Sequence, residues 1–233
     1  KLYIAIDIHK RSWKVQSATD LSLGPHFTAP PEASYLKTWV SNHFPDYQVH
    51  LPYEAGCCGY EPARDFQSYG WNTIVFNPAD ISSTGTAAYQ KTDRIDAKLI
   101  CRELKDGRLN AIGIPGRQRE ELRALFRRRN ALVRDFRRLK TQVKMQLLYL
   151  GITIPEDLDQ PKWSHKFRHW IRSIECYYTT GDTMIDSMMD QYDFLDMQLR
   201  KISNTLRAYC RKHYNDDYYL LRSIPGIGGI TAC

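Results

Sequence analysis

The first eighty residues alternate between short apolar runs and polar or glycine-rich breaks, a pattern typical of a sheet with helices between its strands. Five runs have the length of strands, and two stretches repeat their apolar residues at helical spacing. The expected order is strands at 2–7, 13–18 and 26–29, a helix at 32–43, a strand at 47–54, a helix at 60–69 and a strand at 71–77. This order predicts an α/β fold, a mixed sheet flanked by helices.

One more helix is expected at 90–104, which reads QKTDRIDAKLICREL. Thr92 is a suitable N-cap residue, and Ile95, Leu99 and Ile100 form an apolar side that can pack on the sheet. The preceding loop, 79–89, is small and polar. It is either a plain connector or a segment that covers a site and orders when nucleic acid or metal binds.

From Arg117 onward, apolar residues recur in alternating steps of three and four, which is the pattern of long helices with a heptad seam. The first seam, interrupted by Arg129, contains Leu122, Leu125, Leu132, Phe136, Leu139, Val143, Leu147 and Leu150, and the second contains Met188, Tyr192, Leu195, Leu199, Ile202, Leu206 and Tyr209. Two such helices pair as a coiled coil either within the chain or between chains, and we favour a dimer interface. The predicted domains are 1–112, a coiled-coil arm at 113–216, and the start of a further domain at 217–233.

The excess of basic residues predicts the kind of partner that the chain binds. Lys and Arg outnumber Asp and Glu by 33 to 26, the net charge is +7 and the pI is about 9.1, which favours a polyanion. No apolar run approaches the roughly 18 residues of a membrane span, so we expect a soluble protein with no membrane partner.

The cysteines form no CxxC pair, which favours free thiols in a reducing cytosol. The chain lacks an initial Met and stops within a glycine-rich motif, so we treat it as a fragment or a processed chain.

Four acidic residues fall at the ends of predicted elements. Asp7 lies near the end of the first strand, Glu54 ends the fourth, and Asp93 and Asp96 lie on one face of the helix at 90–104. If the first and fourth strands are neighbours, these carboxylates meet, and like charges without a cation repel one another. Their hard oxygens suit Mg2+ or Mn2+, and two such ions about 3.5–4 Å apart support phosphodiester chemistry. The alternative is that the acids only cap helices and form salt bridges.

Basic residues predict where a phosphate backbone could bind. Lys91 and Arg94 flank the last two acids, and the first long helix carries Arg123, Arg127, Arg128, Arg134, Arg137, Arg138, Lys140 and Lys144. The second long helix carries Asp186, Asp190, Asp193 and Asp196, so a salt-bridge network between the helices or a solvated face is the default interpretation. The arginines outnumber these acids, which favours a phosphate track along the first helix.

Two further stretches leave alternatives open. The segment 155–172 interleaves Trp163, Phe167 and Trp170 with basic residues, so it either stacks on unpaired RNA bases or forms a small aromatic subdomain. The C-terminal LLRSIPGIGGITAC is either a tight structural turn or a turn whose backbone N–H groups bind phosphate.

The segments YIAIDIHKRSWKV, PYEAGCCGY, VFNPADI and QKTDRIDAKLICREL resemble, in order and spacing, the N-terminal domain of the DEDD-type insertion-sequence transposases guided by a bridge RNA. The resemblance implies an RNase H-like fold similar to RuvC, in which Asp7, Glu54, Asp93 and Asp96 are the catalytic, metal-binding acids. It also implies a guide RNA, donor and target DNA, and a location in the bacterial cytoplasm with the nucleoid. The C-terminal stretch resembles the start of the family's second domain, and no segment matches the motif of that domain's nucleophilic serine.

The expected function is therefore the N-terminal part of an RNA-guided DNA transposase or recombinase, incomplete for strand exchange by itself. Two alternatives remain from the residues alone. One is a self-sufficient, metal-dependent nuclease of Holliday junctions, and the other is a non-catalytic nucleic-acid-binding scaffold.

Overall fold

The computed structural model describes residues 1–54, 56, 58–77 and 100–233. The chain forms two compact units, Lys1–Pro115 and Gly116–Cys233, and each is described by itself. The domain boundaries predicted at 112/113 and 216/217 stay predictions.

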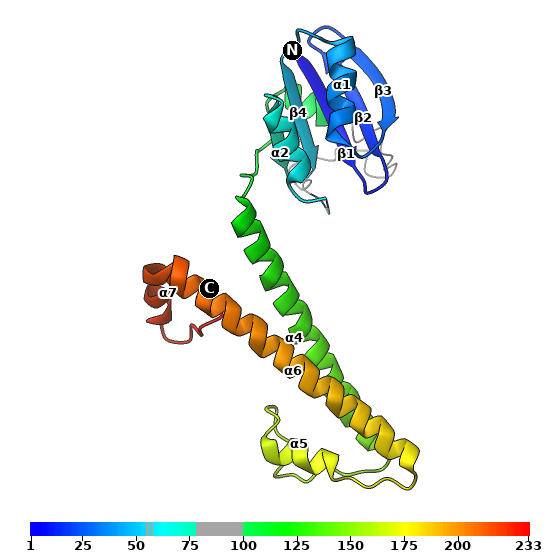
Figure 1. Ribbon diagram of the computed structural model, residues 1–233, viewed down its shortest axis with the longest axis vertical. Helices are drawn as coiled ribbons and strands as arrows, with labels where there is room; N and C mark the ends of the chain where they lie inside the picture. The colour runs from blue at the N-terminus through cyan, green and yellow to red at the C-terminus, as the bar shows by residue number, and fades with distance from the viewer. Residues whose placement is uncertain (55, 57, 78–99) are drawn as a thin grey trace. The chain divides into compact units, whose positions relative to one another are not determined.

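The first unit is built on a five-stranded sheet (Figure 1). The strands are β1 (Leu2–Ile8), β2 (Trp13–Thr19), β3 (Leu23–Ala29), β4 (Val49–Glu54) and β5 (Asn72–Phe76), and their order across the sheet is β3-β2-β1-β4-β5. β2 is antiparallel to both β1 and β3, whereas β1, β4 and β5 run parallel. The predicted mixed sheet is confirmed, and the first and fourth strands are neighbours, which is the condition under which Asp7 and Glu54 meet.

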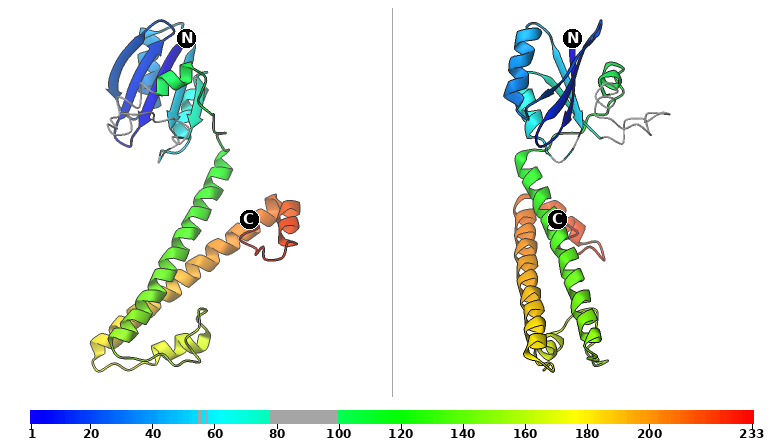
Figure 2. Two further views of the ribbon diagram at one scale, coloured as in Figure 1. Left: turned by 180° about the vertical axis from the view of Figure 1, so that it is seen from behind. Right: turned by 90° about the vertical axis from the view of Figure 1, so that its right-hand side faces the viewer.

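Helices cover the two faces of this sheet differently (Figure 2). α1 (Ala33–His43) and α2 (Glu61–Ser68) pack on one face, where Ile4, Ile6, Leu36 and Phe66 are fully buried. On the other face, the short helix at 100–105 buries Ile100 and Cys101 against Tyr3, Ala5 and Phe76. The face opposite α1 and α2 is therefore covered in part by residues 100–105, through a small apolar cluster of its own.

The third strand is longer than predicted. It begins at Leu23 rather than at residue 26 and includes Gly24 and Pro25. β3 pairs only with β2 and is an edge strand, where a missing proline N–H is tolerated. The side-chain amide of the buried Gln16 also donates to the carbonyl oxygen of Gly24 at 2.9 Å, which ties this part of the strand to β2.

The second unit is an antiparallel pair of long helices, α4 (Arg117–Tyr149) and α6 (Thr179–His213), with α5 (His165–Arg172) in the connection between them and α7 (Asn215–Arg222) after them. The guanidinium Nε of Arg129 donates to Ser203 Oγ at 3.0 Å, and the rings of Phe136 and Tyr192 lie 4.7 Å apart. The two predicted seams thus meet within the chain, and pairing between chains stays a prediction. The buried core of the pair contains Leu132, Leu139, Val143, Leu147, Ile185, Met189, Tyr192 and Leu195.

The aromatic segment between the long helices joins their core. Phe167 and Ile171 of α5 are fully buried, and the ring of Trp163 stacks on Tyr192 at 5.0 Å. Of the two interpretations of 155–172, the structure therefore shows the small aromatic subdomain for Trp163 and Phe167. None of the helices in the described part of the chain is long and apolar enough to cross a membrane.

Candidate metal centre and nucleic-acid interface

Asp7 and Glu54 occupy neighbouring positions on adjacent parallel strands. Ile6 of β1 is paired with Tyr53 of β4, and the next residue on each strand is an acid. Ile6 and Tyr53 are buried against α1 and α2, and because side chains alternate along a strand, Asp7 and Glu54 lie on the opposite face. The structure therefore brings these two predicted residues together, on the face that the helix at 100–105 covers in part.

Asp7 is held by a contact from the turn that follows its strand. His9 Nε2 lies 3.0 Å from Asp7 Oδ2, and the Asp7 side chain remains 26% exposed. Glu54 is exposed at the end of β4, and its partner in β5 is Phe76, which is fully buried. The two carboxylates thus lie beside the buried Phe76 and remain partly accessible to solvent.

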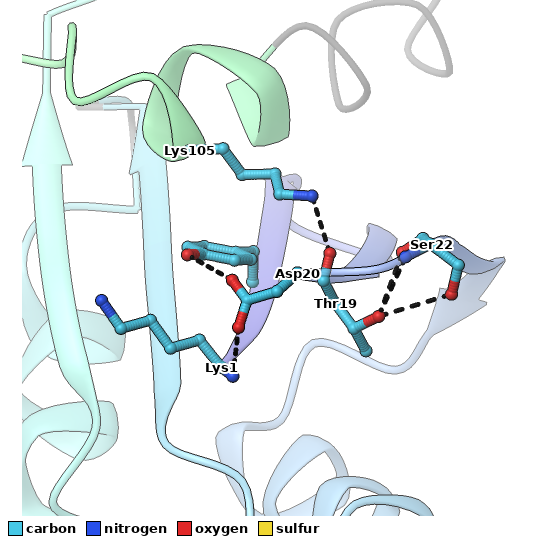
Figure 3. Close-up of polar contacts among 6 residues, drawn as sticks. Lys1, Thr19, Asp20, Ser22 and Lys105 are labelled. Carbon is cyan, nitrogen blue, oxygen red and sulfur yellow. Dashed lines mark hydrogen bonds and ion pairs between the residues drawn. The ribbon is translucent and has the colours of Figure 1, made fainter.

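The helix at 100–105 is fastened at the other end of the same face. Lys105 Nζ donates to the carbonyl oxygen of Thr19 at 2.7 Å, and the adjacent Asp20 accepts from the amino group of Lys1 at 2.8 Å (Figure 3). The phenol of Tyr3 donates to Asp20 at 3.0 Å. Lys105, Tyr3 and Asp20 thus make their contacts at the end of the sheet away from Asp7.

Cys101 anchors the middle of this helix. Its thiol lies 3.8 Å from the carbonyl oxygen of Tyr3 and 3.7 Å from that of Gln16, and burial raises the pKa of the thiol to about 11. The thiol is therefore neutral at physiological pH, and it acts as a small packed group rather than a nucleophile.

The remaining predicted residues of the acidic site, Asp93 and Asp96, lie outside the described residues, as do Lys91 and Arg94. Within the part of the chain that the structure describes, no group of three or more His, Cys, Asp and Glu side chains could hold a metal ion. The described half of the predicted site is the pair Asp7 and Glu54.

The predicted basic residues of α4 separate into two groups. Six arginines are exposed, and none forms an ion pair with another described residue: Arg123, Arg127, Arg128, Arg134, Arg137 and Arg138. Lys144 instead forms an ion pair with Asp159. Lys140 lies over the rings of Phe136, Trp163 and Tyr192 at 4.8, 5.4 and 5.8 Å, and burial lowers its pKa. The six arginines face solvent, whereas Lys140 and Lys144 contact other residues of the second unit.

The acidic residues of α6 find their partners on α5. Arg172 lies 2.9 Å from Asp193, 3.1 Å from Asp190 and 3.9 Å from Asp186, and Asp196 is bound by Arg200 of its own helix. The network predicted between the two long helices thus forms between α5 and α6. Sequence reasoning missed α5 as the source of these cations, although the four-residue spacing of Arg168 and Arg172 is a helical signal.

The glycine-rich C-terminus contains a tight turn. Ile227 N–H donates to the carbonyl oxygen of Ile224 at 3.1 Å, and Gly226 has φ +88°, which favours glycine. Tyr218, Cys210 and Ala232 pack together beside it. This is the structural turn of the two alternatives, and phosphate binding by its N–H groups stays a prediction.

Comparison with known proteins supplies the family. A family model described as a transposase, DEDD_Tnp_IS110, matches residues 4–150. The putative transposase y4qE of Sinorhizobium fredii (strain NBRC 101917 / NGR234) is 32% identical over 124 residues, which are 53% of this chain and 31% of the relative. The transposase for insertion sequence element IS1533 of Leptospira borgpetersenii is 24% identical over 241 residues, which cover all of this chain and 68% of the relative.

The chain thus spans about a third of the length of the first relative and about two thirds of the second. The family match covers the sheet unit from residue 4 onward, including both acids of the candidate centre, and continues through α4. This chain belongs to the family of IS110-type DEDD transposases.

Proposed function

We propose that the sheet unit is an RNase H-like, RuvC-like catalytic domain whose acids Asp7, Glu54, Asp93 and Asp96 bind Mg2+ or Mn2+ and act on DNA phosphodiesters during transposition. The observation that carries the proposal is the placement of Asp7 and Glu54 side by side on one sheet face, in a chain of a transposase family. The sheet order, with an antiparallel β3-β2-β1 part continued by parallel β4 and β5, is compatible with this fold.

The direction of the helix at 100–105 supports a role for Asp93 and Asp96. Lys105 contacts Thr19, which is paired with Leu2, whereas Cys101 contacts Gln16, which is paired with Ala5. Within the described helix, residue 101 therefore lies closer than residue 105 to the end of β1 that carries Asp7.

The sequence predicts that this helix begins at Thr92. In the sequence pattern of that expected helix, Asp93 and Asp96 share a side with Ile100 and Leu104. We infer a site of four carboxylates from this pattern together with the adjacency of Asp7 and Glu54.

The donor set fits a hard divalent cation. Carboxylate oxygens are the ligands that Mg2+ and Mn2+ prefer, and two acids on adjacent strands supply oxygens from a rigid base. When bound, a pair of such ions stabilises the attacking and leaving oxygens of a phosphodiester exchange. The protein's own contribution is to fix the two carboxylates on neighbouring strands, with His9 orienting one oxygen of Asp7.

We assign nucleic-acid binding to the exposed arginines of α4. Arg123, Arg127, Arg134 and Arg138 follow each other at steps of four, seven and four, which places them on one side of the helix, away from the buried seam. From first to last they span about 22 Å. One DNA strand has a phosphate about every 3.4 Å, so this stripe is long enough for about six phosphates.

The finer parts of the proposal follow from the resemblance to bridge-RNA-guided transposases. In this proposal a structured guide RNA selects donor and target DNA, a serine from a further domain acts with the metal site, and copies of the chain associate through the long helices as a coiled-coil dimer or larger homo-oligomer. The protein acts in the bacterial cytoplasm at the nucleoid. The greater length of the two relatives supports the existence of such a further domain.

The metal site is tested by titrating the purified chain with Mn2+ in a calorimeter. We expect saturable binding that Asp7→Asn and Glu54→Gln each weaken at least tenfold, because each removes a carboxylate ligand. Asp65→Asn is the matched control, since Asp65 is an exposed acid of the same unit on α2. Equal Mn2+ affinity in all four proteins would contradict the proposal and favour a non-catalytic scaffold.

The guide RNA is tested by sequencing nucleic acid that copurifies with the chain expressed beside its native flanking DNA. One discrete structured RNA, retained at moderate salt, is the expected result. Heterogeneous nucleic acid together with cleavage of four-way DNA junctions by this chain alone would favour the self-sufficient nuclease instead.

A further inference from the structure

A lysine shares the row of the two acids. Asp7 is paired with Lys14 across the β1–β2 hairpin, and Lys14 is paired with Thr28 of the edge strand β3. Directly opposed residues of antiparallel strands lie on the same face. One row across the sheet therefore reads Thr28, Lys14, Asp7, Glu54 and Phe76.

Burial of the flanking residues confirms the side on which Lys14 lies. Trp13 and Val15, its neighbours in the chain, are buried against the α1 and α2 face. Because alternation places Lys14 on the other side, its ammonium and the carboxylates of Asp7 and Glu54 lie on one face. The side chain is half-buried, and Asp7 is its immediate cross-strand neighbour.

The contact that Lys14 makes is the informative feature. Its ammonium donates to the hydroxyl of Thr28 at 2.8 Å, and it forms no ion pair with a carboxylate among the described residues. The contact of Asp7 is with His9 instead. The ammonium of Lys14 is thus hydrogen-bonded to Thr28, and among the described residues it forms no ion pair with Asp7.

An ammonium beside Asp7 and Glu54 can bind a phosphate of a nucleic-acid strand. A DNA strand over the carboxylates brings phosphates, each with a negative charge, to within about one side-chain length of Lys14. Lysine acts on phosphate as a compact point charge with three rotatable donors, so it tolerates a range of phosphate positions. The hydroxyl of Thr28 orients the ammonium by accepting a hydrogen bond and, being neutral, leaves its positive charge available for a phosphate.

We propose that Lys14 binds a phosphate of the DNA strand whose neighbouring phosphodiester lies at Asp7 and Glu54. Lys14 is then a substrate-binding residue that sets the position of the DNA along the row, and Thr28 is its positioning residue. This inference rests on the proposed function in that it takes the acids as the site of phosphodiester chemistry.

The test measures binding of a fluorescein-labelled four-way DNA junction by anisotropy over a series of KCl concentrations. We expect Lys14→Gln to weaken binding severalfold and to lower the slope of log Kobs against log salt by about 0.9, the loss of one phosphate contact. Lys14→Arg should retain most of the slope because it keeps the charge. Lys37→Gln is the matched control, since Lys37 lies on α1, over the ring of Tyr69.

Mn2+ titration of the same variants separates this proposal from the proposed function. We expect Lys14→Gln to bind Mn2+ as tightly as the unchanged chain or more tightly, because a positive charge near the acids is removed. We expect Thr28→Val to weaken Mn2+ binding, since the released ammonium can then pair with Asp7.

Three outcomes overturn the Lys14 proposal: an unchanged salt slope in Lys14→Gln, an equal fall in Lys37→Gln, or a fall that appears with an RNA duplex but not with the DNA junction. Loss of Mn2+ binding in Asp7→Asn with no change of slope in Lys14→Gln would reject this proposal alone. Unchanged Mn2+ binding in Asp7→Asn would reject the metal site, whereas a lower DNA slope in Lys14→Gln would still support the phosphate contact.

Discussion

The acids of α6 and the acids of β1 and β4 both cluster on one face, but their surroundings differ. On α6, Asp186, Asp190 and Asp193 lie around Arg172, which α5 brings to them. On the sheet, His9 Nε2 lies 3.0 Å from Asp7, and the ammonium of Lys14 donates to Thr28. The acids of α6 are neutralised by arginines of the same chain and serve the fold, whereas Asp7 and Glu54 lie on adjacent strands where, in the proposed function, they hold a divalent cation.

The largest loss of stability is expected from removing the buried ring of Phe167, which fixes α5 and its arginines against α6. Phe167→Ala deletes a fully buried ring that packs against Trp163, and we expect a loss of about 3–5 kcal/mol in the free energy of unfolding. Urea unfolding measures this loss. Lys166→Ala, an exposed neighbour on α5, should cost less than about 1 kcal/mol. A loss below about 1 kcal/mol for Phe167→Ala would show that α5 is not anchored through this ring.

Substitutions in the two acidic clusters should differ in their effect on stabilisation by Mg2+. Asp7→Asn should abolish the rise in melting temperature that Mg2+ causes, a stabilisation of about 2–3 kcal/mol at a hundredfold excess over Kd. Asp193→Asn should preserve that rise and cost about 1 kcal/mol or less, because its contact with Arg172 is largely solvent-exposed. Melting curves with and without Mg2+ measure both effects. An equal Mg2+ response of the two variants would remove the distinction between the clusters.

The sheet unit should lose stability in alkali because of Cys101. Burial raises the pKa of this thiol from 9.0 to about 11, so the folded state keeps its proton where the unfolded state has lost it. Stability is therefore full below about pH 9 and falls as the pH rises to about 11, by about 1–3 kcal/mol. Urea unfolding of the unchanged chain and of Cys101→Ala over this pH range is the measurement. Parallel curves for the two proteins would show that another group causes the decline.

The smallest change in stability is expected on the arginine face of α4. Arg134→Gln combined with Arg138→Gln should change the free energy of unfolding by less than about 0.5 kcal/mol, since both side chains are exposed and without a described ion pair. The same variant should lower the salt slope of DNA binding by about 1.8. Arg200→Gln is the control, because Arg200 pairs with Asp196. A slope that falls equally in the control would indicate a general charge effect.

The hydrophobic pattern predicted the sheet well because its strands obey strict alternation. Ile4 and Ile6 face one side and Tyr3 and Ala5 the other, so the strand and the face that carries Asp7 could be anticipated. The sequence left the adjacency of β1 and β4 as a condition, because strand order depends on contacts between distant segments. The start of β3 was missed because Gly24 and Pro25 are turn residues in most settings. Only the edge position of the strand and the amide of Gln16 make them part of it.

Side-chain partners in the second unit were harder to predict. Lys140 is a surface residue by sequence, but in the hairpin it lies over three aromatic rings contributed by α4, the 155–172 segment and α6. Likewise, the interruption of the seam at Arg129 is resolved by the hydroxyl of Ser203, 74 residues later. Such contacts depend on how distant elements align, which periodicity along one helix does not encode.

The single row across the sheet also determines which changes in chain length the domain can tolerate. Deleting one residue from β1 before Asp7 would exchange the two sides of the strand, turning the acid toward Leu36 and Phe66 and an isoleucine toward solvent. Deleting two would restore the side but shift Asp7 away from Glu54. Natural variants of this sheet should therefore accumulate insertions and deletions in the turns and at β3, while the length of β1 stays constant.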